Sequence, residues 1–138
     1  MPAASYRTVV NAPADHLWSL LLDKITRPDK YISGVTNVRI DEVIDERTLV
    51  RSMELGNGLT LKELITADPK TKTIVFKAIE EKRFTALVVN TVYEQAGVCY
   101  LEYTMSNIPL GDHAPVIGNM DGLIKASVLE MRGVAEAG

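Results

Sequence analysis

The sequence predicts an α+β domain in which a curved antiparallel sheet of seven strands wraps around a long C-terminal helix. Three observations lead to this prediction. An apolar stripe at helical spacing follows a first extended segment. Turn signals then recur between runs rich in Val, Ile, Leu, Thr and Tyr, as in a meander of strands. A second helical stripe ends the chain.

The N-terminal part predicts one strand and two short helices. Ser5 to Asn11 reads as a strand, and Asn-Ala-Pro ends it. Pro13 suits the first turn of a helix, and Asp15 lies near the positive end of its dipole. This helix should run to about Lys24, and 26–31 predicts a second short helix. The apolar stripe consists of Ala14, Leu17, Trp18, Leu21 and Ile25.

The middle of the chain predicts six further antiparallel strands. They span about 34–44, 47–55, 59–67, 72–79, 84–95 and 98–106. The turns are marked by Asp45-Glu46, Gly56-Asn57-Gly58, Asp68-Pro69-Lys70, Glu81-Lys82 and Ala96-Gly97.

A long final helix is predicted from Pro115 to about Val134. Gly118 and Gly122 lie in its first half, and each weakens a helix by about 1 kcal/mol relative to alanine. The first half should therefore be the softer wall of any interior space. The predicted inward face consists of Val116, Met120, Leu123, Ile124, Ser127, Val128, Met131 and Val134.

Composition bounds the function classes. The 138 residues suit one domain over 1–138, and the single Cys99 excludes an internal disulfide or a Cys-rich zinc site. The net charge of −3 with no basic block argues against a nucleic-acid partner. Met1 to Arg7 does not resemble a signal peptide, and no apolar run is long enough for a membrane span. We expect a cytoplasmic protein, monomeric or homodimeric.

The order of elements resembles the START and birch-pollen-allergen superfamily, also called SRPBCC or helix-grip. The most specific local match is VNAPADHLWSLLLDK, with Ala12, Pro13, Asp15, Leu17 and Trp18 at the matching positions. The stretches RPDKYISGV and RSMEL also resemble the AtaL-like branch, which is largely uncharacterised.

The resemblance implies a helix-grip fold with a cavity between sheet and last helix. Members of this superfamily bind lipids, sterols, plant hormones or polyketides there. Some are cyclases, dehydratases or hydrolases, and one branch activates a chaperone. The superfamily has no universal catalytic motif, so the resemblance assigns no catalytic residue and no cofactor, and fold does not decide function.

The turn Gly56-Asn57-Gly58 predicts the register of one hairpin. A three-residue loop pairs Leu55 with Leu59, Met53 with Leu61 and Arg51 with Glu63. These six side chains share one face because side chains alternate with period two. That face is the more apolar, so we assign it inward.

Extending the pairing to the later hairpins gives further inward positions, and a one-residue slip would invert any of these strands. They are Ile74, Phe76, Ala78, Ala86, Val88, Asn90, Val92, Cys99, Leu101, Tyr103 and Met105. The predicted ligand-binding residues are Arg51, Glu63, Asn90, Tyr103, Met53, Leu61, Phe76, Val88, Leu101, Met105, Met120, Leu123 and Ile124.

Arg51 and Glu63 have two interpretations at this point. A buried ion pair is weak evidence for stability, so an inward pair favours a functional role in the cavity. Arg51 would receive a ligand carboxylate or phenolate, Glu63 would hold Arg51 or act as a base, and Tyr103 would donate to a ligand carbonyl. Alternatively, the pair lies at the solvent end of the hairpin and contributes only about 0–1 kcal/mol.

The remaining chemistry-bearing side chains predict no site. His16 should be solvated on helix one, and His113 should be a loop or capping residue that could also line a pocket mouth. The two histidines lack metal-ligand spacing. Trp18 and Cys99 are best explained as core residues. The sequence contains no nucleophile elbow and no phosphate loop.

Three functions remain open. The first is binding of a hydrophobic or aromatic small molecule, for which adaptable methionines are suited. The second is a cyclase- or dehydratase-type enzyme acting on a polyketide-like substrate in the same cavity. The third is a partner-binding module, which would have a closed interior and an exposed apolar patch. Because the sequence contains no recognisable catalytic motif, we favour binding.

Overall fold

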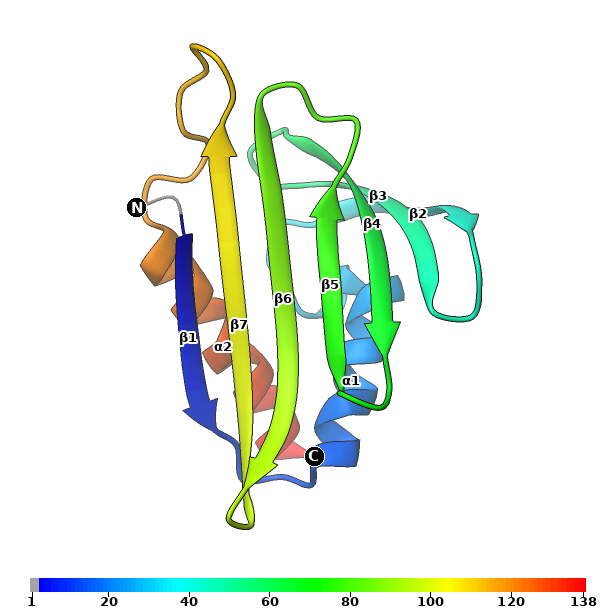
Figure 1. Cartoon of the computed structure of the whole chain (residues 1–138), viewed down its shortest axis with the longest axis vertical. Coiled ribbons are helices and arrows are strands. Elements are labelled where there is room, and N and C mark those ends of the chain that lie inside the picture. Colours follow the sequence, from blue (N-terminus) through cyan, green and yellow to red (C-terminus); the bar gives the residue numbers. More distant parts are fainter. Residues whose placement is uncertain (1–2) are drawn as a thin grey trace.

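Seven antiparallel strands form one sheet with the order β1-β7-β6-β5-β4-β3-β2. The computed structural model describes residues 3–138. The strands are β1 (Ala3–Val9), β2 (Thr36–Val43), β3 (Thr48–Glu54), β4 (Thr60–Asp68), β5 (Thr73–Ala78), β6 (Phe84–Gln95) and β7 (Val98–Pro109). From β3 to β7, every strand pairs with the strand that precedes it in the chain. β1 pairs with β7 and forms one edge of the sheet (Figure 1). The predicted sheet is confirmed.

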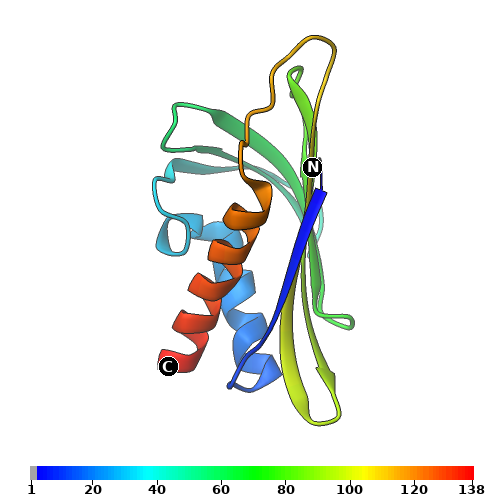
Figure 2. The ribbon, with the colours of Figure 1, turned by 90° about the vertical axis from the view of Figure 1, so that its left-hand side faces the viewer.

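Two helices lie on the same side of the sheet (Figure 2). They are α1 (Ala14–Thr26) and α2 (Met120–Ala137), and a single 3₁₀ turn, η1 (Pro28–Lys30), follows α1. The whole predicted stripe of α1 is buried, and Asp15 lies in its first turn. The second short helix predicted over 26–31 is only this 3₁₀ turn.

The final helix begins five residues later than predicted. Pro115 is outside it, and α2 starts at Met120. Asn119 decides the start, because its side-chain Oδ1 accepts a hydrogen bond of 3.0 Å from the N–H of Gly122. Gly118 therefore precedes the helix, and the predicted soft helical wall is instead a non-helical segment between β7 and α2.

The inward face of α2 is narrower than predicted. Met120, Ile124, Val128 and Met131 are buried as expected, and Ala135 joins them. Val134 is 38% exposed instead of inward, and Leu123 is 45% exposed although it lines the interior cavity. Both lie at the border of the stripe, beside positions that face the sheet.

Strand limits differ from the predictions by small amounts. β1 covers Ala3–Val9 instead of 5–11, although the N–H of Val10 still donates to Cys99. β7 continues to Pro109, three residues beyond the prediction, because Thr85 and Phe84 pair with its end. β2 is two residues shorter at its start, and its pairing with β3 is shifted at two places.

The predicted hairpin register is confirmed. Arg51 pairs with Glu63 and Met53 with Leu61, while the N–H of Leu55 donates to the carbonyl of Leu59. The inner face of the later strands is also as predicted. Ile74, Asn90 and Leu101 are fully buried, and Cys99 and Trp18 belong to the core.

His16 differs from its prediction. It is half-buried rather than solvated, and its Nε2 has no hydrogen-bond partner among residues 3–138. Gly138 lies close by, since a Cβ at that position would be 3.9 Å from His16 Nε2. Within the same described residues, no helix is both long and apolar enough to cross a membrane.

Candidate functional site

A cavity of about 360 Å³ lies between the concave face of the sheet and α2. Strands β3 to β7 form one wall. The end of α1, the turn after it, the segment before α2 and the first turns of α2 form the others. The volume lies within the usual range for pockets that bind small molecules. The interior beside the cavity is filled by the core side chains Leu17, Leu21, Ile74, Leu101 and Val128.

All but two of the predicted ligand-binding residues line this cavity. They are Arg51, Met53, Leu61, Glu63, Phe76, Val88, Asn90, Tyr103, Met105, Leu123 and Ile124. The inward assignment of the Arg51–Glu63 pair is therefore correct in position. Its role in ligand binding stays a prediction.

Leu101 and Met120 were also predicted as ligand-binding, but they do not line the cavity. Leu101 points to the inner face but is fully buried in the core. It pairs with Val92 and Thr8, at a part of the sheet where packed side chains fill the interior. Met120 begins α2, and its side chain also belongs to the core cluster.

Lys24 is the functional candidate that sequence reasoning missed. It lines the cavity at the end of α1 and is 7% exposed. A signal was present, because Lys24 lies three residues after Leu21 and seven after Leu17, on the buried stripe of the helix. Other lining residues that were not predicted as ligand-binding include Tyr31, Phe84, Asn107, Val116, Ile117, Ser127 and Met131.

A buried ion pair joins β3 to β4 and to α1. Arg51 Nη2 donates to Glu63 Oε1 at 2.7 Å. Arg51 Nη1 donates to the carbonyls of Ile25 at 2.8 Å and of Lys24 at 3.3 Å. The side chains of Arg51 and Glu63 are only 2% and 9% exposed. The pair therefore lies inside the molecule, not at the solvent end of the hairpin.

Lys24 extends from α1 to the opposite wall. Its Nζ donates to Asn90 Oδ1 at 2.5 Å and to Tyr103 Oη at 3.0 Å. The same nitrogen lies 4.4 Å from the ring centre of Tyr103 and 5.3 Å from that of Phe76. No carboxylate among residues 3–138 forms an ion pair with it. Lys24, Asn90, Tyr103, Arg51 and Glu63 form what we call the polar cluster.

Burial changes the acidity of two members of the polar cluster. It lowers the pKa of Lys24 to about 7, with the positive charge of Arg51 adding to the effect and Glu63 opposing it. Burial also raises the pKa of Tyr103, with a smaller contribution from Glu130. The Tyr103 hydroxyl therefore keeps its proton near neutral pH, while Lys24 can gain or lose one.

Two N–H groups of the polar cluster have no hydrogen-bond partner within residues 3–138. They are Arg51 Nε and Asn90 Nδ2, and both atoms are buried. A buried donor without a partner costs about 1–3 kcal/mol, so such groups demand an explanation. The polar cluster thus has more donors than its own acceptors satisfy.

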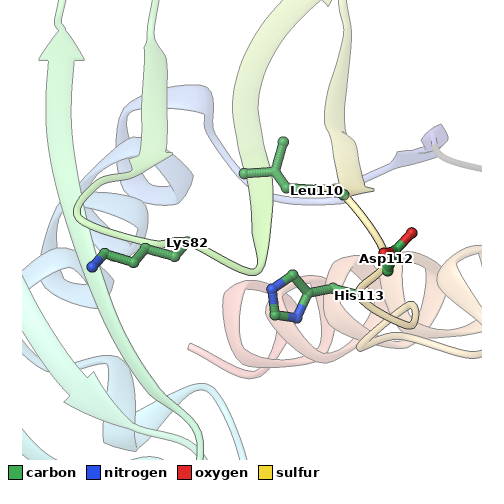
Figure 3. A pocket seen from close by; sticks show the side chains of 5 residues that line it. Lys82, Leu110, Asp112 and His113 are labelled. Carbon is green, nitrogen blue, oxygen red and sulfur yellow. The ribbon is translucent and has the colours of Figure 1, made fainter.

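A second hollow, of about 420 Å³, is wide open to solvent. Lys82 contributes from the segment between β5 and β6, and Leu110, Gly111, Asp112 and His113 from the segment after β7. Figure 3 shows that the Lys82, Asp112 and His113 side chains point in different directions and do not converge. His113 is thus a loop residue, as predicted, and lines this hollow instead of the cavity. Residues 3–138 contain no group of His, Cys, Asp or Glu side chains that could hold a metal ion.

No protein-family model and no curated protein matches the sequence. Solved structures do match it. The Zhui aromatase/cyclase from Streptomyces sp. R1128 is 20% identical with a TM-score of 0.69, over 97% of this chain and 87% of that one. The ginseng major latex-like protein 151 from Panax ginseng is 12% identical with a TM-score of 0.70, over 98% and 95%. The chain has the helix-grip fold.

A third helix-grip structure, TTHA0849 from Thermus thermophilus, is 14% identical with a TM-score of 0.64, over 99% of this chain and 90% of that one. All three matches span nearly the whole chain, so they cover the sheet, both helices and the cavity walls between them. At these identities the likeness establishes the helix-grip fold, and the function has to be argued from the residues of the site.

Proposed function

We propose that this helix-grip protein binds a small hydrophobic or aromatic molecule in the cavity between sheet and α2. The observation that carries the proposal is the composition of the lining. Apolar side chains make up most of the wall, and its three charged side chains, Lys24, Arg51 and Glu63, belong to one buried polar cluster. A few convergent polar groups in an otherwise apolar pocket are typical of small-molecule sites.

The flexible side chains of the wall suit a ligand of irregular shape. The wall contains Met53 of β3, Met105 of β7 and Met131 of α2. Methionine fills irregular gaps well because its side chain is unbranched and polarizable. Phe76 and Phe84 offer ring faces to an aromatic ligand. The helix-grip neighbours that are named as an aromatase/cyclase and a major latex-like protein support the same general use.

The proposal is tested with a neutral fluorescent probe, N-phenyl-1-naphthylamine, and with native mass spectrometry of gently purified protein. Val88→Trp places a large ring in the cavity, whereas Val89→Trp makes the same change on the other face of β6. We expect the probe to bind wild type and Val89→Trp and to bind Val88→Trp at least about tenfold more weakly. Equal binding by the two variants, or none by wild type together with no co-purified molecule, contradicts the proposal.

A second candidate is a cyclase-type enzyme that uses the same cavity. The observation that favours it is Lys24, whose pKa of about 7 suits proton transfer near neutral pH. Lys24→Met and Glu63→Gln distinguish the two functions once a ligand has been recovered. An enzyme loses turnover by orders of magnitude, whereas a binding protein shows only a change in affinity. A partner-binding module would have a closed interior, whereas this interior contains a cavity of about 360 Å³.

A further inference from the structure

We propose that the ligand of this cavity is an apolar molecule with one carboxylate, and that Lys24 binds the carboxylate at the polar cluster. This inference rests on the proposed binding function and names the head group of the ligand. Three observations carry it, namely the charge balance of the cavity wall, the excess of hydrogen-bond donors and the position of Lys24.

The charge balance of the wall lacks one anion. The charged side chains that line the cavity within residues 3–138 are Lys24, Arg51 and Glu63. Glu63 is already paired with Arg51 at 2.7 Å. A protonated Lys24 therefore leaves one uncompensated positive charge in a buried site, which is costly. A single carboxylate brings the site to zero net charge, while a cationic ligand would increase the imbalance.

The polar cluster also has more hydrogen-bond donors than acceptors. Lys24 as an ammonium has three donors, and two are used on Asn90 and Tyr103. Arg51 Nε and Asn90 Nδ2 donate to nothing in residues 3–138. An ionised carboxylate only accepts hydrogen bonds and has about four lone-pair positions. It can accept the third hydrogen bond of Lys24, whereas an alcohol brings a further donor to a cluster that already has an excess of donors.

The position of Lys24 determines the orientation of the ligand. Its aliphatic stem starts on α1, and its nitrogen lies beside Asn90 of β6 and Tyr103 of β7, within the polar cluster. The remaining wall has no charged side chain and is mostly apolar, for example at Val116, Ile117 and Leu123 near the start of α2. A carboxylate at Lys24 therefore leaves the apolar body of the ligand against the methionine and phenylalanine side chains.

The surroundings of Lys24 make acid binding dependent on pH. The charged groups beside Lys24 are Arg51 of β3 and Glu63 of β4. Tyr103 of β7 is a further titratable neighbour, and the charge of Glu130 on α2 contributes to its raised pKa. Burial lowers the pKa of Lys24 to about 7. A bound carboxylate favours the ammonium and raises that pKa, so binding above neutral pH takes up a proton.

The experiment compares matched pairs of probes in displacement of N-phenyl-1-naphthylamine at pH 6.5. The pairs are octanoate with 1-octanol and 2-naphthoate with 2-naphthalenemethanol. We expect at least one acid to bind about tenfold or more tightly than its alcohol, as charge-assisted hydrogen bonds predict. If the dye binds and neither acid exceeds its alcohol, the head-group inference is wrong and the proposed function stands. If the dye and all four compounds fail to bind, the proposed function itself is contradicted.

Two variants assign the acid preference to Lys24. Lys24→Met should bring acid and alcohol affinities within about threefold of each other, while Lys77→Met, an exposed lysine on β5, should keep the wild-type ratio. Asn90→Asp keeps the shape of the wall and gives Lys24 an internal carboxylate, so it should also abolish the acid preference. Should Lys24→Met fail to fold, Asn90→Asp and the wild-type ratio still decide. An unchanged ratio in either folded variant overturns the inference.

Calorimetry supplies a readout that a merely structural role of Lys24 would not change. Titrations at pH 8 in two buffers of different ionisation enthalpy should show uptake approaching one proton per acid bound, and none per alcohol. Acid affinity should be nearly constant between about pH 5.5 and 6.5 and should fall at higher pH. Absence of proton uptake at pH 8 overturns the role of Lys24.

Discussion

Arg51 donates a hydrogen bond of 2.8 Å from its guanidinium to the backbone carbonyl of Ile25. A side chain of the sheet thereby satisfies the last turn of α1, where backbone carbonyls have no partner within the helix. The residue before Ile25 is Lys24, so this contact also fixes where the cavity lysine leaves its helix.

Removing the guanidinium should be strongly destabilising. In Arg51→Met, Glu63 stays buried without its partner and the carbonyl of Ile25 loses its donor. We expect a loss of about 3–5 kcal/mol in the free energy of unfolding, measured by urea denaturation. The double variant Arg51→Met/Glu63→Leu should recover much of this loss because no charge remains unpaired. A single variant within about 1 kcal/mol of wild type would show that the pair is not buried as described.

Lys24 should make stability rise with pH. Its pKa is about 7 when folded and near 10.5 in the unfolded chain, so between these values the unfolded state binds more protons. The cost of burying Lys24 is therefore largest below pH 7 and is removed as pH rises toward 10.5. Relative to Lys24→Met, wild type should gain roughly 3–5 kcal/mol from pH 7 to pH 10. Parallel pH profiles of the two proteins in urea denaturation would contradict the depressed pKa.

The turn between η1 and β2 should not tolerate a side chain at Gly34. Gly34 has φ +85°, and a Cβ there would lie 3.2 Å from Gly56 Cα. Gly34→Ala should cost about 1–3 kcal/mol from strain and close contact together. Gly58→Ala is the control, because its φ is +81° but nothing lies within 4 Å of the new Cβ. Thermal denaturation should rank Gly34→Ala below Gly58→Ala, and the reverse order would be inconsistent with this close approach.

The start of α2 should depend on one amide side chain. Asn119→Ala removes the cap to Gly122 and should cost about 1 kcal/mol, whereas Asn119→Asp should cost little. Gly122→Ala should also destabilise, although alanine favours helices, because its Cβ would overlap the Asn119 amide. In Asn119→Ala/Gly122→Ala the overlap disappears, so a double-mutant cycle should show coupling between the two sites. Strict additivity would argue against the capped geometry.

The hairpin around Gly56-Asn57-Gly58 shows how much the sequence determines. The loop length sets the register, and the register places Arg51 and Glu63 side by side on the apolar face. That local rule was sufficient to predict the orientation of most strand residues in the cavity wall. Where the wall comes from packing between distant elements, as with Tyr31 and Ile117, no local rule identifies it.

Lys24 and the start of α2 were beyond the rules applied to the sequence. A lysine is normally assigned to solvent even on an apolar stripe, whereas the partners of Lys24 on β6 and β7 show that it points inward. For α2, the predicted start was Pro115, whereas the helix begins after Asn119. The side-chain hydrogen bond from Gly122 to Asn119 determined the outcome.

The late start of α2 has a mechanical consequence. Val116 and Ile117 form part of the cavity wall, yet they lie before the helix, in a segment without regular backbone pairing. Moving them outward breaks none of the cooperative hydrogen bonds of α2, whose first turn is anchored separately by Asn119. The width of the cavity at this point is therefore governed by a few side-chain contacts, while the helix that grips the sheet can remain intact.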